Sequence, residues 1–209
     1  MARYTGPVCK LCRRENTKLF LKGDKCMSEK CPMNDPKVKI PGPHGDRRRK
    51  LTEYGTQLRE KQKAKFIYGV LEKPFRNLYA KAEQQKGLTG PNLMTLLELR
   101  LDNVIFRLGF ARTRREARQI VDHKHVLVNG KSVNIPSYQV KAGDKIEIRE
   151  KSKSLQRYKD IIAATEGHLV PGWLTADREN LCGEVVEKPN REQIDVPVNE
   201  TLIVELYSK

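Results

Sequence analysis

The chain has 209 residues and a formal net charge of +15, because 41 Lys and Arg residues stand against 26 Asp and Glu. Only 38% of the residues are apolar, and no run approaches the roughly 18 apolar residues that a membrane-spanning helix needs. The first residues contain no apolar signal core, which disfavours secretion. We therefore expect a cytoplasmic protein of one large or two small domains, with no membrane partner.

The positive charge is concentrated in the first third of the chain. Residues 1–70 carry a net charge of +11, whereas residues 151–209 carry −2. So uneven an excess predicts a positive face opposed to a polyanion, and nucleic acid is the favoured one. An anionic membrane surface is the alternative, but the basic run at 47–50 lacks the apolar opposite face of a membrane-binding helix. A merely charged surface is disfavoured, since an unneutralised excess of this size repels itself.

Four cysteines near the N-terminus, Cys9, Cys12, Cys26 and Cys31, have the spacing C-x2-C-x13-C-x4-C. Two close pairs separated by a short loop are typical of a closed four-thiolate metal site, for which zinc is favoured and an iron–sulfur cluster is the alternative. Four protein ligands leave no open position, so the metal would be structural. Two disulfides would need an oxidising compartment. The fifth cysteine, Cys182, is predicted to be a small buried apolar residue.

The following elements are predicted from apolar spacing and end signals. A segment rich in Pro and Gly at 32–45 indicates a linker. The capping box at 113–116, Thr-Arg-Arg-Glu, marks the start of a helix. Earlier helices are predicted at about 46–70, 74–86 and 93–108.

Beyond that helix the apolar residues no longer recur at helical spacing but alternate with polar ones, which is typical of strands. Asn129-Gly130 predicts a primed turn between two strands. Strands are predicted at 126–128, 131–133 and 145–149, and a helix at 154–165. Residues 168–209 are predicted to form turns and short strands, among them 202–206. Because this last segment is apolar and slightly acidic, we expect it to pack onto the basic helices.

The first turns of the capped helix contain four arginines: Arg112, Arg114, Arg115 and Arg118. A helix N-terminus already carries partial positive charge, so each added cation there is unfavourable by a few tenths of a kcal/mol. The cluster is explained if it binds phosphates, to which Arg donates bidentate hydrogen bonds. A solvated basic face is the alternative. A helix pair could also read a DNA major groove, but any helical hairpin gives that weak signal.

Several motifs carry a more specific resemblance, and they cover nearly the whole chain. They are Arg100-Leu101-Asp102-Asn103, Arg107-Leu108-Gly109-Phe110-Ala111, Arg114-Arg115-Glu116-Ala117-Arg118-Gln119, Val128-Asn129-Gly130, Ile135-Pro136-Ser137-Tyr138, and the segments 1–7, 58–63, 196–200 and 205–208. The central motifs resemble the S4 RNA-binding domain, and the chain as a whole resembles the bacterial small-subunit ribosomal protein S4 family.

The resemblance implies an α+β fold with an inserted module. An N-terminal four-cysteine metal-binding arm and linker would occupy residues 1–45. A mainly helical basic domain at 46–97 would be completed by the C-terminal segment 168–209. The S4 RNA-binding domain, a two-helix hairpin plus a small antiparallel sheet, would be inserted at 98–165.

The resemblance also implies a function. The family binds the 5′ domain of small-subunit ribosomal RNA, nucleates subunit assembly, contacts ribosomal protein S5, lies near the path by which messenger RNA enters the subunit, and influences translational accuracy. Some members repress translation of their own messenger. One departure from the family pattern is Pro43, which replaces a residue able to hydrogen-bond in the turn before His44. Some members lack the cysteines, so the metal is expected to brace the N-terminal arm.

Candidate RNA-binding residues share positive charge, a polar side chain or an aromatic ring near the basic segments. They are Arg3, Arg13, Arg14, Lys22, His44, Arg47, Arg48, Arg49, Lys50, Tyr54, Arg59, Lys61, Lys63, Lys65, Arg76, Arg107, Arg112, Thr113, Arg114, Arg115, Arg118, Gln119, His123, Lys124, Asn129 and Lys131. An RNA-modifying enzyme with the same module is disfavoured, because no paired carboxylates, nucleophile–base set or phosphate loop emerges. We therefore expect a protein with no catalytic residues and no small-molecule substrate.

Overall fold

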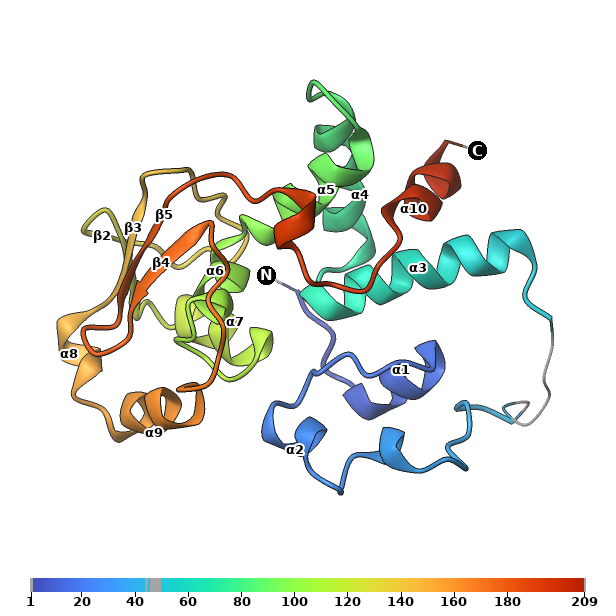
Figure 1. The fold of residues 1–209 in the computed structure, drawn as a ribbon, viewed down its shortest axis with the longest axis horizontal. Coiled ribbons are helices and arrows are strands. Elements are labelled where there is room, and N and C mark those ends of the chain that lie inside the picture. The colour runs from blue at the N-terminus through green and yellow to red at the C-terminus, as the bar shows by residue number, and fades with distance from the viewer. Residues whose placement is uncertain (1, 44, 46–49, 209) are drawn as a thin grey trace. The chain divides into compact units, whose positions relative to one another are not determined.

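The computed structural model describes residues 2–43, 45 and 50–208, and these form two compact units (Figure 1). The first unit is built from described residues of 1–93 and 196–209, and the second is residues 94–195. Across the described residues, the combination of many helices with a small antiparallel sheet confirms the α+β class. None of the helices in the described ranges is both long and apolar enough to cross a membrane.

The first unit is helical. Its elements are α1 (Val8–Glu15), α2 (Asp24–Met27), the 3-10 turn η1 (Pro32–Asn34), α3 (Glu53–Tyr68), α4 (Glu72–Glu83), the start of α5 (Thr89–Glu98) and α10 (Glu200–Tyr207). The long helix α3 begins where the Thr52 side chain accepts a hydrogen bond from the Gly55 N–H. It ends at Gly69, whose φ of 63° favours a residue without a Cβ. The helix predicted at 46–70 is confirmed over Glu53–Tyr68, and residues 46–49 of that prediction lie outside the described residues.

The C-terminal helix α10 packs along α3, so the strand predicted at 202–206 is wrong (Figure 1). Asn199 caps this helix by accepting a hydrogen bond from the Thr201 N–H. Gln57, buried on α3, donates to Glu205, and the ring of Tyr207 stacks on Tyr79 with centroids 4.4 Å apart. The cap and these tertiary contacts favour a helix over the strand preference of the β-branched residues.

The second unit places two short helices against a five-stranded antiparallel sheet. The helices are α6 (Leu101–Arg107) and α7 (Arg114–Asp122), and the sheet has the strand order β2-β1-β3-β5-β4. Its strands are β1 (Val126–Val128), β2 (Lys131–Ser132), β3 (Lys145–Ile148), β4 (Leu174–Asp177) and β5 (Cys182–Val185). The unit also contains the rest of α5, then α8 (Glu150–Lys153), α9 (Gln156–Ala164) and the 3-10 turn η2 (Arg191–Gln193). Apolar residues of α6, α7 and the sheet form one continuous core.

The C-terminal segment 168–209 is divided between the units, whereas we expected all of it to complete the helical domain. β5 pairs with β3, with Gly183 opposite Ile146, and β4 extends the sheet from β5. This pairing provides hydrogen-bond partners for the N–H and C=O groups along the edge of β3, which would otherwise be unpaired. Trp173, fully buried, joins the same core. Only residues from 196 onward belong to the first unit, and Cys182 is half-buried rather than buried.

Candidate nucleic-acid interface

Helix α7 begins at the predicted residue, and a carboxylate organises its first turn. Thr113 Oγ1 accepts a hydrogen bond from the Glu116 N–H at 3.1 Å. The Glu116 carboxylate accepts from the Arg112 N–H at 2.9 Å and lies 3.1 Å from the Arg112 guanidinium and 3.2 Å from that of Arg157. Burial acts to raise the pKa of Glu116, but the bonds from Arg112 and the charge of Arg157 outweigh it and lower that pKa. This helix start is therefore a cation cluster held around one ionised carboxylate.

The outer side of α7 carries an exposed polar stripe. Arg115, Gln119 and His123 follow one another at four-residue spacing and are all exposed, which places them on one side of the helix. The exposed Lys124 follows directly. The structure thus brings five of the predicted residues of this region to the surface, since Arg112 is exposed as well.

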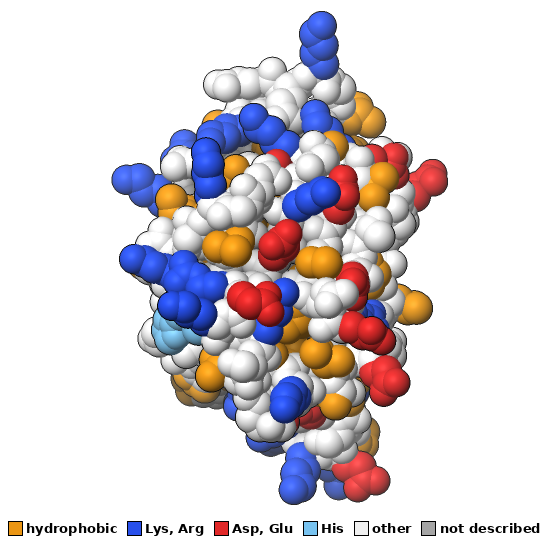
Figure 2. Space-filling view, turned by 90° about the vertical axis from the view of Figure 1, so that its left-hand side faces the viewer, with side chains coloured by type: hydrophobic (Ala, Val, Ile, Leu, Met, Phe, Trp, Pro, Cys, Tyr) orange, Lys and Arg blue, Asp and Glu red, His pale blue; other side chains and the backbone are white. Residues whose placement is uncertain are grey.

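The β1–β2 hairpin brings two more of the predicted residues to the surface of the second unit. Asn129 has a φ of 49° in the predicted turn, and its amide donates to Asp144 at 2.8 Å while its carbonyl oxygen accepts from the Lys145 N–H at 2.9 Å. Its first role is therefore to shape the turn. Lys131, on β2, is exposed. Figure 2 shows that basic side chains gather along one side of a face of the molecule and acidic ones along the other.

Two predicted arginines lie inside the second unit instead. Arg118 is 5% exposed, with its guanidinium 3.9 Å from the Asp102 carboxylate, which also binds the buried Arg100. Arg107 is also 5% exposed, and its Nη2 contacts two carboxylates, those of Glu98 and Asp195. Both guanidinium groups stabilise the packing of α6 and α7, and neither is placed on the surface.

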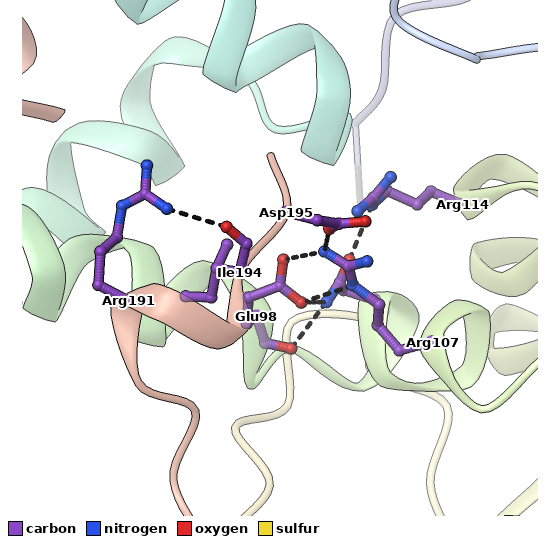
Figure 3. A network of polar contacts seen from close by, with 7 residues as sticks. Glu98, Arg107, Arg114, Arg191, Ile194 and Asp195 are labelled. Carbon is purple, nitrogen blue, oxygen red and sulfur yellow. Dashed lines mark hydrogen bonds and ion pairs between the residues drawn. The ribbon is translucent and has the colours of Figure 1, made fainter. Parts of the chain in front are cut away.

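A continuous polar network surrounds Arg107 (Figure 3). Arg107 donates to both oxygens of Glu98, at 2.9 and 2.8 Å, and its guanidinium lies 2.6 Å from Asp195. Asn103 donates to the same Glu98 carboxylate at 2.7 Å and to the Glu98 carbonyl at 2.9 Å. The Asn103 carbonyl oxygen accepts from Arg114 Nε at 2.7 Å. Burial acts to lower the pKa of Arg107, but the Glu98 charge and hydrogen bond and the Asp195 contacts raise it.

Our sequence analysis missed Glu98, Asn103 and Asp195 as parts of this site. A signal for the first existed: a glutamate directly follows a helical run of apolar residues, and a fully buried carboxylate requires a cationic partner. The sequence offers eleven Lys and Arg residues between 98 and 150 as partners. Only the folded chain selects Arg107 among them.

In the first unit, the cations of α3 have carboxylate partners. Arg59 lies 2.9 Å from Glu15, whose side chain is fully buried. Lys61 and Lys65 both bind Glu72, at 2.9 and 2.5 Å. Lys63 binds Glu60 at 2.5 Å. These four predicted residues therefore contribute to the packing of the helical unit, and their charges are largely offset there.

The remaining predicted residues fall into two groups. Exposed side chains are those of Arg3, Arg14, Lys22, Lys50, Tyr54 and Arg76, and that of Arg13 is half-buried. His44, Arg47, Arg48 and Arg49 lie outside the described residues.

The N-terminal cysteines are free thiols in this structure. Cys12, Cys26 and Cys31 are buried and Cys9 is half-buried, and the Lys22 N–H donates to Cys26 Sγ at 3.3 Å. Burial raises the pKa of Cys12, and the other three thiols add to the effect. Among the described residues, no three or more His, Cys, Asp or Glu side chains are arranged to hold a metal ion. The metal-binding arm is therefore not confirmed.

Comparison with known proteins gives a consistent picture. A family model described as the ribosomal protein S4/S9 N-terminal domain matches residues 3–98, and one described as the S4 domain matches residues 99–146. The chain is 59% identical over 210 residues to "Small ribosomal subunit protein uS4" of Natranaerobius thermophilus, covering 100% of both chains. It is 78% identical over 161 residues to the protein of that name from Lachnospira eligens, which covers 77% of this chain and 82% of the relative. The one from Desulforamulus reducens is 56% identical over 209 residues, again covering 100% of both.

Proposed function

Because the chain belongs to the ribosomal protein S4 family, we propose that it is a structural component of the small ribosomal subunit in the cytoplasm and binds small-subunit ribosomal RNA directly. The observation that carries the proposal is the exposed basic surface of the second unit, formed by α7 and the β1–β2 hairpin. Double-stranded RNA offers a major groove that is too deep and narrow for a recognition helix, so contact through phosphates and shape is the suitable mode. No catalytic role and no small-molecule substrate are proposed.

Within the RNA, we propose the 5′ domain as the primary site and an early role in subunit assembly. The proposal has four further parts. The protein contacts ribosomal protein S5 and lies near the path of incoming messenger RNA. It also influences translational accuracy and represses translation of its own messenger. These points rest on the family resemblance of the sequence. The charge distribution supports an RNA-facing side and a side suited to other contacts, since residues 151–209 carry a net charge of −2.

The proposal is tested by measuring Kd of the full chain for a transcript of the 5′ domain, an unrelated structured RNA and duplex DNA, over a range of salt concentrations. All three affinities should fall with salt, because binding releases counterions from phosphates. A preference of at least about 1,000-fold for the 5′-domain transcript is expected of a specific site. Equal affinity for the three nucleic acids would contradict a ribosomal RNA-binding function.

Two substitutions on the basic surface refine the test. Arg115→Gln and Lys131→Gln should each weaken binding and reduce the salt dependence by about one released counterion. Lys159→Gln, at an exposed position on α9, is the matched control and should leave Kd unchanged. If all three variants bind equally well, the interface lies elsewhere on the chain.

We also propose that Cys9, Cys12, Cys26 and Cys31 bind one structural Zn²⁺, with an iron–sulfur cluster as the alternative. The spacing of the four thiols supports this, as do the burial of three of them and the N–H donor on Cys26 Sγ. The metal would supply a cross-link that braces the N-terminal arm. The thiols would supply the negative charge that holds it.

A further inference from the structure

The orientation of Arg114, the first residue of α7, is held by two residues of α6. Its Nε donates to Asn103 Oδ1 at 2.7 Å, and its guanidinium carbon lies 4.4 Å from the centre of the Phe106 ring. A hydrogen bond in the guanidinium plane and an aromatic ring against its face restrict both tilt and rotation. We call Asn103 and Phe106 the Arg114 clamp.

Each half of the clamp is itself held in place. The Asn103 amide donates to the carbonyl and to the carboxylate of Glu98, and this carboxylate is bound in turn by Arg107 (Figure 3). The amide is thereby oriented with its oxygen toward Arg114. On the other side, the Phe106 ring packs against the core and forms a T-shaped contact with the His168 ring, with centroids 5.4 Å apart.

An arginine whose side chain is already ordered, at the start of a helix, binds an anion at a lower entropic cost than a mobile one. A free Arg side chain loses up to about 2 kcal/mol of rotamer entropy when it binds in one geometry, and an ordered one has already lost much of it. Arg114 is also the first residue of α7, where backbone N–H groups and the helix dipole favour a negative charge. Pre-ordering therefore increases the affinity of this position for a phosphate group.

We infer that Asn103 and Phe106 are positioning residues for RNA binding, which orient Arg114 toward a backbone phosphate without contacting the RNA themselves. This inference rests on the proposed function, and it assigns an RNA-binding role to a half-buried aromatic ring and a buried amide inside the second unit.

A double-mutant cycle tests the inference. The full chain and its Phe106→Leu, Arg114→Gln and double variants are titrated with the 5′-domain transcript at several salt concentrations. Arg114→Gln should weaken binding about tenfold and lower the salt dependence by about one counterion. Phe106→Leu should weaken binding about threefold, the size of an exposed cation–π contact. In the Arg114→Gln background, Phe106→Leu should have no further effect, because the residue on which it acts has gone.

Two controls separate positioning from a general loss of structure. Phe106→Leu combined with Lys131→Gln, a change on β2 outside the clamp, should show additive effects on Kd. Phe106→Tyr, which keeps the ring, should restore the affinity. Urea unfolding of every variant shows which of them remain folded, and Asn103→Ala provides a second clamp variant if Phe106→Leu does not fold.

Each outcome of the cycle decides the inference. If Phe106→Leu weakens binding equally in both backgrounds, or if Arg114→Gln binds as the unchanged chain does, the clamp has no role in RNA binding, while the proposed function stands. If the unchanged chain shows no preference for the transcript, the proposed function fails and the inference with it.

Discussion

The carboxylate of Glu98, whose side chain is fully buried, receives hydrogen bonds from both Nε and Nη2 of Arg107, at 2.9 and 2.8 Å. A paired and fully hydrogen-bonded geometry of this kind is what allows two charges to remain in a protein interior.

The substitution Arg107→Met should destabilise the chain by about 3–5 kcal/mol, because it leaves the Glu98 carboxylate buried without its cation. Urea unfolding followed by circular dichroism measures the change. Glu166→Gln, at an exposed position in the same unit, should shift the midpoint very little. If Arg107→Met is as stable as this control, the bridge does not contribute to the fold.

A second prediction concerns Gly183, which lies in β5 between β3 and β4. A Cβ at this position would lie 2.6 Å from Leu108 Cδ2 and 2.7 Å from the carbonyl oxygen of Thr175. The backbone oxygen cannot move away without disturbing the sheet, so Gly183→Ala should lower the free energy of unfolding by about 2 kcal/mol. Gly167→Ala is the matched control, since nothing lies within 4 Å of its Cβ position. Equal unfolding midpoints for the two variants would contradict the close packing of β5 against Leu108 and β4.

The third prediction concerns pH. Burial acts to raise the pKa of Glu72, but the hydrogen bonds from Lys65 and Lys61 outweigh it and lower this pKa from 4.5 to about 2. A carboxylate with a lowered pKa stabilises the folded chain above its unfolded pKa, and the contribution is lost as pH falls from about 4.5 to about 2. Because the Glu72 side chain is 49% exposed, solvent screening keeps the effect below about 1 kcal/mol.

The corresponding experiment compares Glu72→Gln with the unchanged chain by urea unfolding between pH 2 and 7. The difference in stability should be largest above pH 5 and should disappear near pH 2. Glu83→Gln, an exposed carboxylate at the other end of α4, is the control. A difference that grows as the pH falls would show that the lysine pairing does not stabilise the fold.

The fourth prediction tests the proposed zinc. The purified chain should contain a stoichiometric amount of zinc, Cys12→Ser should lose most of it, and Cys182→Ser should retain it, because only Cys12 belongs to the four-cysteine set. Elemental analysis of the three proteins measures this. Removal of the metal by a chelator should lower the thermal midpoint of the unchanged chain but not that of Cys12→Ser. Iron with acid-labile sulfide would favour the cluster, and a metal-free chain would contradict both.

Local features of the second unit follow directly from sequence. The start of α7 at a Thr113 cap and the β1–β2 turn at Asn129-Gly130 were both predicted, because a capping side chain and a turn residue with positive φ act within four residues of each other along the chain. The exposure of Arg115, Gln119 and His123 follows from the helical period once the start is known.

Long-range choices could not be made this way. The sequence shows four arginines around the start of α7, but not that Arg118 turns inward to Asp102 while Arg115 faces solvent. Nor does it show that β5 would take the free edge of β3. A strand edge accepts any segment with suitable spacing, and register depends on the core that both segments share.

The motifs of the sequence were enough to indicate the family and the α+β class, while composition and the spacing of nearby residues indicated the positive charge and the helices α3, α4, α7 and α9. Which cations are buried in pairs and which remain on the surface depends on tertiary packing. The physical reason is that burying a charge requires an opposite charge within hydrogen-bonding distance. That distance is set by how α5 and α6 pack on each other and on the segment around Asp195, which lies far from both helices along the chain.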